Sequence, residues 1–220
     1  MPITWTWLPV HDFISGIMDS KQITASPFAG IAFLDSWSDP DQLIAQKGIG
    51  LSPPLQDLLR WRGSLTQRLQ DIIGERVELQ LINHDRKSSW PNDDCFWPRM
   101  DPSPCHGDVL IRNAWLVLGG HRMVFAHSQI LLDGLPDSDR CAIAAGNLAL
   151  GYLFMEKNGL LKRENLQVNR VSCHHFNLLA TFGGGQPCWC RRSMFHVNDD
   201  LRARILEIFP SALPAGDQPC

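Results

Sequence analysis

The sequence lacks the features that mark membrane proteins, nucleic-acid-binding proteins and disulfide-rich secreted scaffolds. It has no run of Lys and Arg, and its net charge is −3, so no nucleic-acid partner is expected. The longest uncharged apolar stretch, residues 141–155, is shorter than the roughly 20 residues that a membrane helix needs. No basic segment opens the chain as in a signal peptide, and the seven Cys are odd in number and scattered. We therefore expect a cytoplasmic protein with reduced thiols and no membrane partner.

Length and composition fit one ordinary globular domain. The 220 residues are 44% hydrophobic and 20% charged. A chain of this length can bury a substantial core and leaves little room for a second one. We therefore expect residues 1–220 to form a single domain and the protein to be a monomer. Residues 1–50 give weak signals, with one short helix expected near residues 10–18.

Local patterns predict an α+β fold, a single domain with a six-stranded, mostly antiparallel sheet and flanking helices. Ser64 has the pattern of a helix N-cap, with Gln67 at the third helical position. Residues 85–107 are rich in Pro, Asp and Ser, which predicts a long loop. The predicted helices cover residues 54–62, 64–73 and 137–150, and the predicted strands cover 77–81, 110–118, 123–132, 166–171, 192–197 and 205–209. Helices followed by a run of strands, one helix and more strands are typical of α+β proteins.

Gly119 and Gly120 predict a tight hairpin between the second and third of these strands. With these glycines as the two central turn residues, Leu118 would lie opposite His121, and Arg112 would lie opposite His127. Side chains alternate between the faces of a strand, so Arg112 and His127 would end an otherwise apolar strip on one face. A three-residue loop would change this register.

Two cations on an apolar face require an anionic partner, because burying unpaired charge is costly. The alternation of the last strand places Glu207 on the apolar face that also carries Ile205 and Phe209. One interpretation is a buried structural salt bridge between Arg112 and Glu207. The other is a site for an anionic ligand, to which the planar Arg fork is well suited. The pattern alone leaves both open, and it predicts for Glu207 either a raised pKa or a specific partner.

Five segments, in order, resemble the chorismate lyases of proteobacterial type. The segments are residues 62–70 (RGSLTQRLQ), the hairpin 110–113 (LIRN) with 124–128 (VFAHS), 149–154 (ALGYLF), 188–195 (CWCRRSMF) and 206–210 (LEIFP). The resemblance covers about residues 55–214. It departs from the family at Leu206, which replaces the usual Thr, and at Cys188 and Cys190, which replace Leu and Ala.

The resemblance implies an enzyme that splits chorismate into 4-hydroxybenzoate and pyruvate, with no metal and no cofactor, in ubiquinone biosynthesis. It implies an internal site closed by helical flaps. Arg112 would bind the ring carboxylate, assisted by the backbone N–H groups of Leu65 and Leu150. Glu207 would face the ring 4-position, as general acid to the ether oxygen or as a hydrogen-bond partner. His127 would either help to bind the second carboxylate or only pack in the core.

Two alternatives to this lyase remain at this stage. One is a non-catalytic binder of an aromatic acid, since a similar fold serves as the effector domain of certain transcription regulators. Those regulators carry a basic DNA-binding module, and no segment here has that character. The other alternative is a related lyase that gives a different aromatic acid.

Other patterns favour structural roles. Residues 173–175 (CHH) and the pair Cys188 and Cys190 could suggest zinc, but their spacing matches no regular zinc module. The glycines at 183–185 lack the Lys and the helix of a phosphate-binding loop, which favours a flexible turn. Arg191 and Arg192 are typical of a solvated strand end, although the motif context of Arg192 makes it a weak exception.

Overall fold

The computed structural model describes residues 31–48, 50–91, 97, 106–146, 149–151, 161–173, 187–210 and 213. The helices are α1 (Pro40–Lys47), α2 (Pro53–Arg60), α3 (Leu65–Ile73) and α4 (Asp137–Ala145), and the strands are β1 (Ile31–Phe33), β2 (Glu78–Ser89), β3 (His106–Leu118), β4 (His121–Leu131), β5 (Leu161–Cys173), β6 (Cys188–Val197) and β7 (Asp200–Phe209). Within these residues, no helix has both the length and the apolar character to span a membrane.

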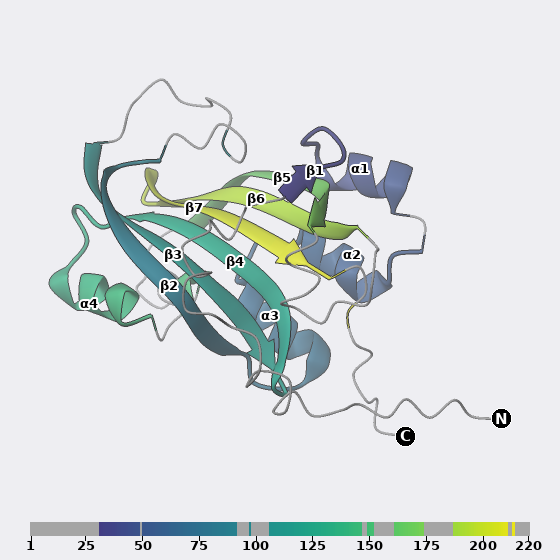
Figure 1. Ribbon diagram of the computed structural model, residues 1–220, viewed down its shortest axis with the longest axis horizontal. Coiled ribbons are helices and arrows are strands. Elements are labelled where there is room, and N and C mark those ends of the chain that lie inside the picture. The colour runs from purple at the N-terminus through teal and green to yellow at the C-terminus, as the bar shows by residue number, and fades with distance from the viewer. Residues whose placement is uncertain are drawn as a thin grey trace, which may run out of the picture.

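The described strands form one antiparallel sheet in the order β1-β5-β6-β7-β4-β3-β2. The sheet curls, and α2 and α3 lie together behind it while α4 lies beside the other end of the long hairpin strands (Figure 1). The α+β class with an antiparallel sheet is as predicted. The predicted number of six strands is wrong, because the short β1 adds a seventh at the edge by pairing with β5. Three residues are too few to show alternation.

Several predicted boundaries also change. Residues 85–89 belong to β2, because they pair with β3, so the predicted loop at 85–107 begins too early. The helix predicted at 137–150 ends at Ala145, where Gly146 adopts a left-handed conformation with φ of 72°. Helix α1 was not predicted. It begins after Asp39, whose side chain accepts a hydrogen bond from the N–H of Asp41. The helix predicted at 10–18 lies outside the described residues.

The hairpin turn is confirmed, but the register beyond it differs from the prediction. Leu118 lies opposite His121, with Gly119 and Gly120 at positive φ in the turn. One extra residue, Met123, then bulges from β4, so that Leu116 pairs with Val124. A one-residue slip moves every later side chain to the other face of the sheet. Arg112 therefore lies opposite Ser128, and the predicted pairing of Arg112 with His127 is wrong.

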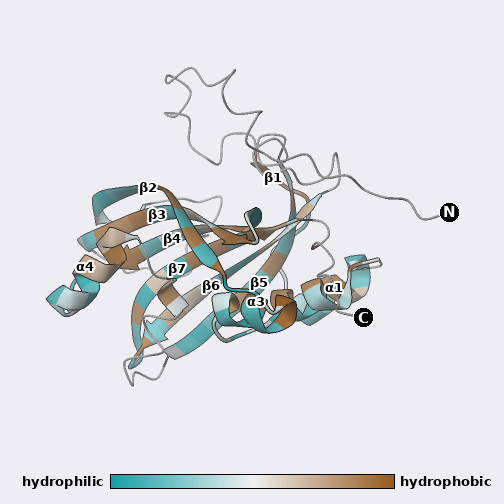
Figure 2. Cartoon of the chain, turned by 90° about the horizontal axis from the view of Figure 1, so that it is seen from below, coloured by the Kyte–Doolittle hydropathy of each residue, from teal (hydrophilic) through white to brown (hydrophobic). Residues whose placement is uncertain are grey.

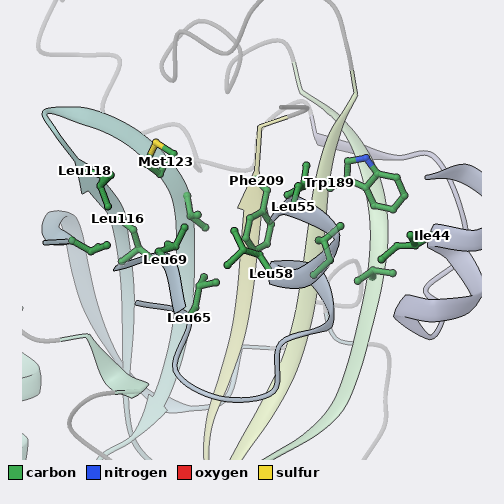
Figure 3. Close-up of a cluster of buried hydrophobic side chains, with 14 of the residues drawn as sticks. Ile44, Leu55, Leu58, Leu65, Leu69, Leu116, Leu118, Met123, Trp189 and Phe209 are labelled. Carbon is green, nitrogen blue, oxygen red and sulfur yellow. The ribbon is translucent and has the colours of Figure 1, made fainter. Parts of the chain in front are cut away.

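The two faces of the sheet carry separate apolar cores. On one face, which we call the pocket face, Leu65 and Leu69 of α3 pack toward Leu116 and Met123, and Leu58 of α2 packs toward Phe209 (Figure 3). A second cluster on this face joins α4 to Leu110, Ile130, Leu150, Phe195, Ala203 and Ile205. The opposite, far face is covered by a cluster that includes Trp97, Trp115 and Phe125. Figure 2 shows the hydrophobic residues of the curled sheet, with α1 and α3 on the same side of it.

Candidate active site

A pocket lies on the pocket face, between the two apolar clusters. Its walls take Leu65 and Leu116 from one cluster and Leu150, Phe195 and Ile205 from the other. Its polar lining comes from five side chains: Thr66, Arg112, Ser128, Arg163 and Glu207. It encloses about 380 Å³ of empty space, part of which is open to solvent. A mostly apolar lining with a few convergent polar groups is typical of a small-molecule site.

The sheet register brings Arg112 and Glu207 to this pocket from different strands. Arg112 pairs with Ser128 of β4, and Ser128 pairs with Ile205 of β7, two residues from Glu207. All four therefore share the pocket face. Two strand spacings and a two-residue offset separate the Cα atoms of Arg112 and Glu207 by roughly 12 Å. Their side chains both line the pocket, so they face it from two ends.

Arg112 supplies a desolvated positive charge to the pocket wall. Its side chain is 3% exposed, and burial lowers its pKa to about 10. The guanidinium therefore stays protonated at neutral pH. A planar cation in a dry wall favours a carboxylate, which it can bind through two parallel hydrogen bonds.

Glu207 is held as a carboxylate by two arginines. Its Oε2 accepts hydrogen bonds from Arg191 Nε at 2.5 Å and from Arg163 Nη1 at 3.1 Å. Burial alone would raise the pKa of Glu207, but the charges and hydrogen bonds of Arg191 and Arg163 outweigh burial and lower it. Of the two alternatives predicted for Glu207, a raised pKa is therefore wrong and a specific partner is confirmed. The partners are not the predicted Arg112 but two arginines from β5 and β6.

Arg191 ties Glu207 to the end of helix α2. Its Nη1 donates to the carbonyl oxygens of Leu58 and Trp61, which belong to the last turn and C-cap of that helix. Carbonyls at a helix C-terminus lack intrahelical partners and favour a cation. Arg191 is fully buried, so its interpretation as a solvated strand end is wrong. It fixes α2, and through α2 the entry to α3, relative to the carboxylate.

The N-terminus of α3 faces the pocket through Leu65 and Thr66. Ser64 caps this helix, as predicted, because its Oγ accepts a hydrogen bond from the N–H of Gln67. The N–H groups of the first turn have no carbonyl partner within their own helix, and the helix dipole favours an anion there. Gly151, beside Leu150, packs closely against Ser64, since a Cβ at this glycine would lie 3.1 Å from Ser64 Oγ. The two segments expected to supply backbone N–H groups therefore meet at the pocket.

His127 lies on the far face of the sheet and does not line the pocket. It pairs with Asn113 and Leu206 in the register of β4. Its Nδ1 lies 2.8 Å from Asn113 Oδ1, and its Nε2 lies 3.3 Å from Gln129 Nε2. Because Asn113 Nδ2 donates to Asn83 Oδ1, the Asn113 oxygen is the acceptor and the His127 Nδ1–H donates to it. The substrate-binding position predicted for His127 is therefore wrong, because the bulge at Met123 reverses its face.

His127 should make the protein less stable in mild acid. Burial lowers its pKa to about 4 from the ordinary 6.5, so between these values the unfolded chain binds the proton and the folded one does not. Stability is then full above pH 6.5 and falls by about 3 kcal/mol as the pH drops toward 4. The measurement is the free energy of unfolding in urea across this range. His127→Asn, which cannot titrate, should lose less over the same interval, and parallel curves for the two proteins would contradict the expectation.

The chain matches the model of the "Chorismate pyruvate-lyase Rv2949c-like" family over residues 59–215. The chain belongs to this family of chorismate pyruvate-lyases. A relative from Pseudomonas putida, described as a probable chorismate pyruvate-lyase, is 27% identical over an alignment of 167 residues that covers 72% of this chain and 82% of the relative. The match includes every described pocket residue on α3 and the strands, from Leu65 to Glu207.

Solved structures that match part of this chain share little sequence with it. The effector domain of PhnF from Mycobacterium smegmatis is 11% identical, with a TM-score of 0.48 over 67% of this chain and 88% of that domain. The C-terminal domain of the histidine utilization repressor from Pseudomonas syringae is 12% identical, with a TM-score of 0.47 over 66% of this chain and 96% of that domain.

Sequence reasoning missed Arg163 and misjudged Arg191, which together surround Glu207. Arg163 sits in the charged run Lys162-Arg163-Glu164, which has the character of a solvated strand. No local signal reveals it, because alternation from the buried Leu166 and Val168 leads to Glu164. Arg163 reaches the pocket face only through the register shift between Glu164 and Gln167. Cys188 and Cys190 are buried on the far face, where burial raises the pKa of the Cys190 thiol. Over the described ranges, no group of three His, Cys, Asp or Glu is placed to hold a metal ion.

Proposed function

We propose that this chain converts chorismate into 4-hydroxybenzoate and pyruvate. The observation that carries the proposal is one pocket, in a member of the chorismate pyruvate-lyase family, that gathers Arg112, Glu207, Leu65 and Leu150. These are the residues that the family resemblance assigns to the substrate. They come from β3, β7, α3 and residues 149–151, so only the fold brings them together.

The proposed reaction is an elimination that makes the ring aromatic. The C4–H bond and the C3–O bond to the enolpyruvyl group break, and the C4 hydroxyl stays on the ring. The hydrogen lost from C4 is balanced by the hydrogen gained in the methyl group of pyruvate, so no water, oxidant or reductant is consumed. Because aromatisation drives the reaction, the protein's task is to orient the substrate and exclude water.

Arg112 and the two N–H groups would hold the ring carboxylate. A buried guanidinium and the amides at the start of a helix are both strong partners for an anion. The side chains of Leu65 and Leu150 also form apolar walls, which offer the substrate ring no polar contact. The ring would then extend from Arg112 toward Glu207, along the roughly 12 Å that separates their Cα atoms.

Glu207 would accept a hydrogen bond from the C4 hydroxyl. Two arginines lower its pKa, so the group is ionised at neutral pH and has no proton to give to the ether oxygen. This favours the hydrogen-bonding role over the general-acid role. An ionised acceptor beside C4 also aligns the ring for loss of the neighbouring hydrogen and stabilises the phenol as it forms.

The direct test is incubation of the purified chain with chorismate while pyruvate and 4-hydroxybenzoate are measured. Both should appear in equal amounts and in proportion to protein. Equal amounts of pyruvate and a different aromatic acid would identify a related lyase instead. Tight binding of 4-hydroxybenzoate with no pyruvate release, even when product is removed continuously, would show a non-catalytic binder.

A further inference from the structure

Arg163 is a second cation in the pocket wall, and the ring carboxylate does not account for it. Its side chain is 1% exposed, it lines the pocket, and its guanidinium lies over the ring of Phe195 at 4.3 Å. Nη1 donates to Ser193 Oγ at 2.9 Å and to Glu207 Oε2 at 3.1 Å. Burial lowers the pKa of Arg163 to about 10, so the group is cationic at neutral pH.

The remaining donors of Arg163 are weakly used. Nη2 has one long contact of 3.4 Å to the carbonyl oxygen of Gly63, and Nε is buried with no acceptor among the described residues. A buried Arg normally has its N–H groups satisfied. The surplus of donor capacity therefore favours an acceptor that enters with a ligand.

The charges around Glu207 point the same way. Arg163 and Arg191 carry two positive charges, and Glu207, which accepts hydrogen bonds from both, carries one negative charge. These three buried groups together leave a net charge of +1. Burying such an excess is costly unless an anion joins it, and the second carboxylate of chorismate is such an anion.

We propose that Arg163 binds the enolpyruvyl carboxylate of chorismate, so that the pocket recognises a dianion. This inference rests on the proposed function. With C1 toward Arg112 and C4 toward Glu207, the enolpyruvyl group on C3 lies beside the Glu207 end of the ring. Arg163 is the pocket-lining cation that touches Glu207. Arg191 is not part of the pocket lining, and its Nε and Nη1 donate to Glu207 and to the end of α2.

This placement also gives Arg163 a task in the reaction. The leaving group is enolpyruvate, whose negative charge grows as the C3–O bond breaks. A fixed cation beside its carboxylate stabilises that developing charge. Arg163 would thus contribute to binding of the substrate and to departure of the leaving group, while 4-hydroxybenzoate, which has no second carboxylate, would not use it.

The test compares a dianionic ligand with a monoanionic one. The ligands are 3-(carboxymethoxy)-4-hydroxybenzoate, which retains a side-chain carboxylate, its carboxamide, and 4-hydroxybenzoate. In wild-type protein the diacid should bind at least about 30-fold more tightly than the carboxamide. Arg163→Gln should remove this preference and change the affinity for 4-hydroxybenzoate by less than about threefold. The control is Arg170→Gln. Arg170 lies on β5, as Arg163 does, but it pairs with Asp35, so this variant should keep the preference.

The outcomes separate this inference from the proposed function. Wild-type protein that neither turns over nor binds chorismate would overturn the proposed function. Wild-type turnover with equal affinity for diacid and carboxamide would overturn the role of Arg163 alone, as would an unchanged preference in Arg163→Gln. Because Arg163 supports Glu207, Arg163→Lys provides a more conservative variant. If neither variant folds, the affinities of wild-type protein for the diacid and the carboxamide still test whether the pocket binds a second carboxylate.

Discussion

Replacing Arg112 by Ala should lower kcat/KM for chorismate by about 30-fold to a few thousand-fold, chiefly through a higher KM. Truncating one partner of a buried, hydrogen-bonded charge pair costs about 2–5 kcal/mol, and each 1.4 kcal/mol is about tenfold. Arg112 is 3% exposed, so water cannot readily replace it opposite a bound carboxylate. Steady-state kinetics with chorismate, together with the affinity for 4-hydroxybenzoate, would measure the loss.

Arg112 and Arg163 should differ in their ligand profiles. Arg112→Ala should weaken both chorismate and 4-hydroxybenzoate, because both carry the ring carboxylate. Arg112→Lys keeps the charge but loses the planar fork, so we expect an intermediate loss.

The matched control for Arg112 is Arg192→Ala. Arg192 is also buried, but it lies on the far face, over the ring of Trp37 and hydrogen-bonded to Gln167. Its removal should leave both kinetic constants close to wild type. Unfolding curves for both variants separate a lost ligand contact from a lost fold. Unchanged kcat and KM in folded Arg112→Ala would rule out the assignment of the site.

The sequence indicates that Arg112 and Glu207 each lie on an apolar face of their own strand. Residues two positions away are apolar in both cases, Leu110 and Ala114 for Arg112 and Ile205 and Phe209 for Glu207, and the turn at Gly119 and Gly120 is a strong local signal. That the two residues share one face of the sheet follows from the pairing of β3, β4 and β7. The position of His127 could not be derived in the same way. A β-bulge adds one residue without a distinctive composition, and the bulge at Met123 lies in the continuous apolar run 123–126, which gives no sign of an extra residue.

The partners of Glu207 could not be predicted from the sequence, because β6 is buried on both faces. All residues from Cys188 to Phe195 are buried, so the strand shows no alternation to read. The pair of arginines within it divides between the faces, with Arg191 beside Glu207 and Arg192 beside Gln167. Which arginine meets a carboxylate depends on strand pairings between segments far apart in sequence, and those pairings leave no local pattern.

Glu207→Ala should lower kcat more than it raises KM and should also destabilise the protein. The free energy of unfolding should fall by about 3–5 kcal/mol, because Arg163 and Arg191 would keep their buried charges without a counterion. That is a large part of the 5–15 kcal/mol typical of a domain. The two effects are measured separately, by urea unfolding and by kinetics at a temperature where the variant is folded.

The pH dependence and a control carboxylate distinguish this loss from general damage. The pKa of Glu207 is lowered below its ordinary 4.5, so its contribution to stability is present above pH 4.5 and disappears as the pH falls through the folded value. The stability gap between wild type and Glu207→Gln should therefore be constant at neutral pH and shrink in acid. Asp57→Asn, which breaks the half-exposed pair with Arg68, should cost much less stability than Glu207→Gln.

Glu207→Gln removes the negative charge but keeps the shape of the side chain, so it tests the two separately. The amide keeps one oxygen that can accept from an arginine or from the C4 hydroxyl, but its NH₂ group can only donate and meets other donors in this pocket. We therefore expect Gln to restore little of the lost turnover. A folded Glu207→Gln variant with wild-type kcat would show that the carboxylate only balances Arg163 and Arg191, and that the elimination proceeds without its charge.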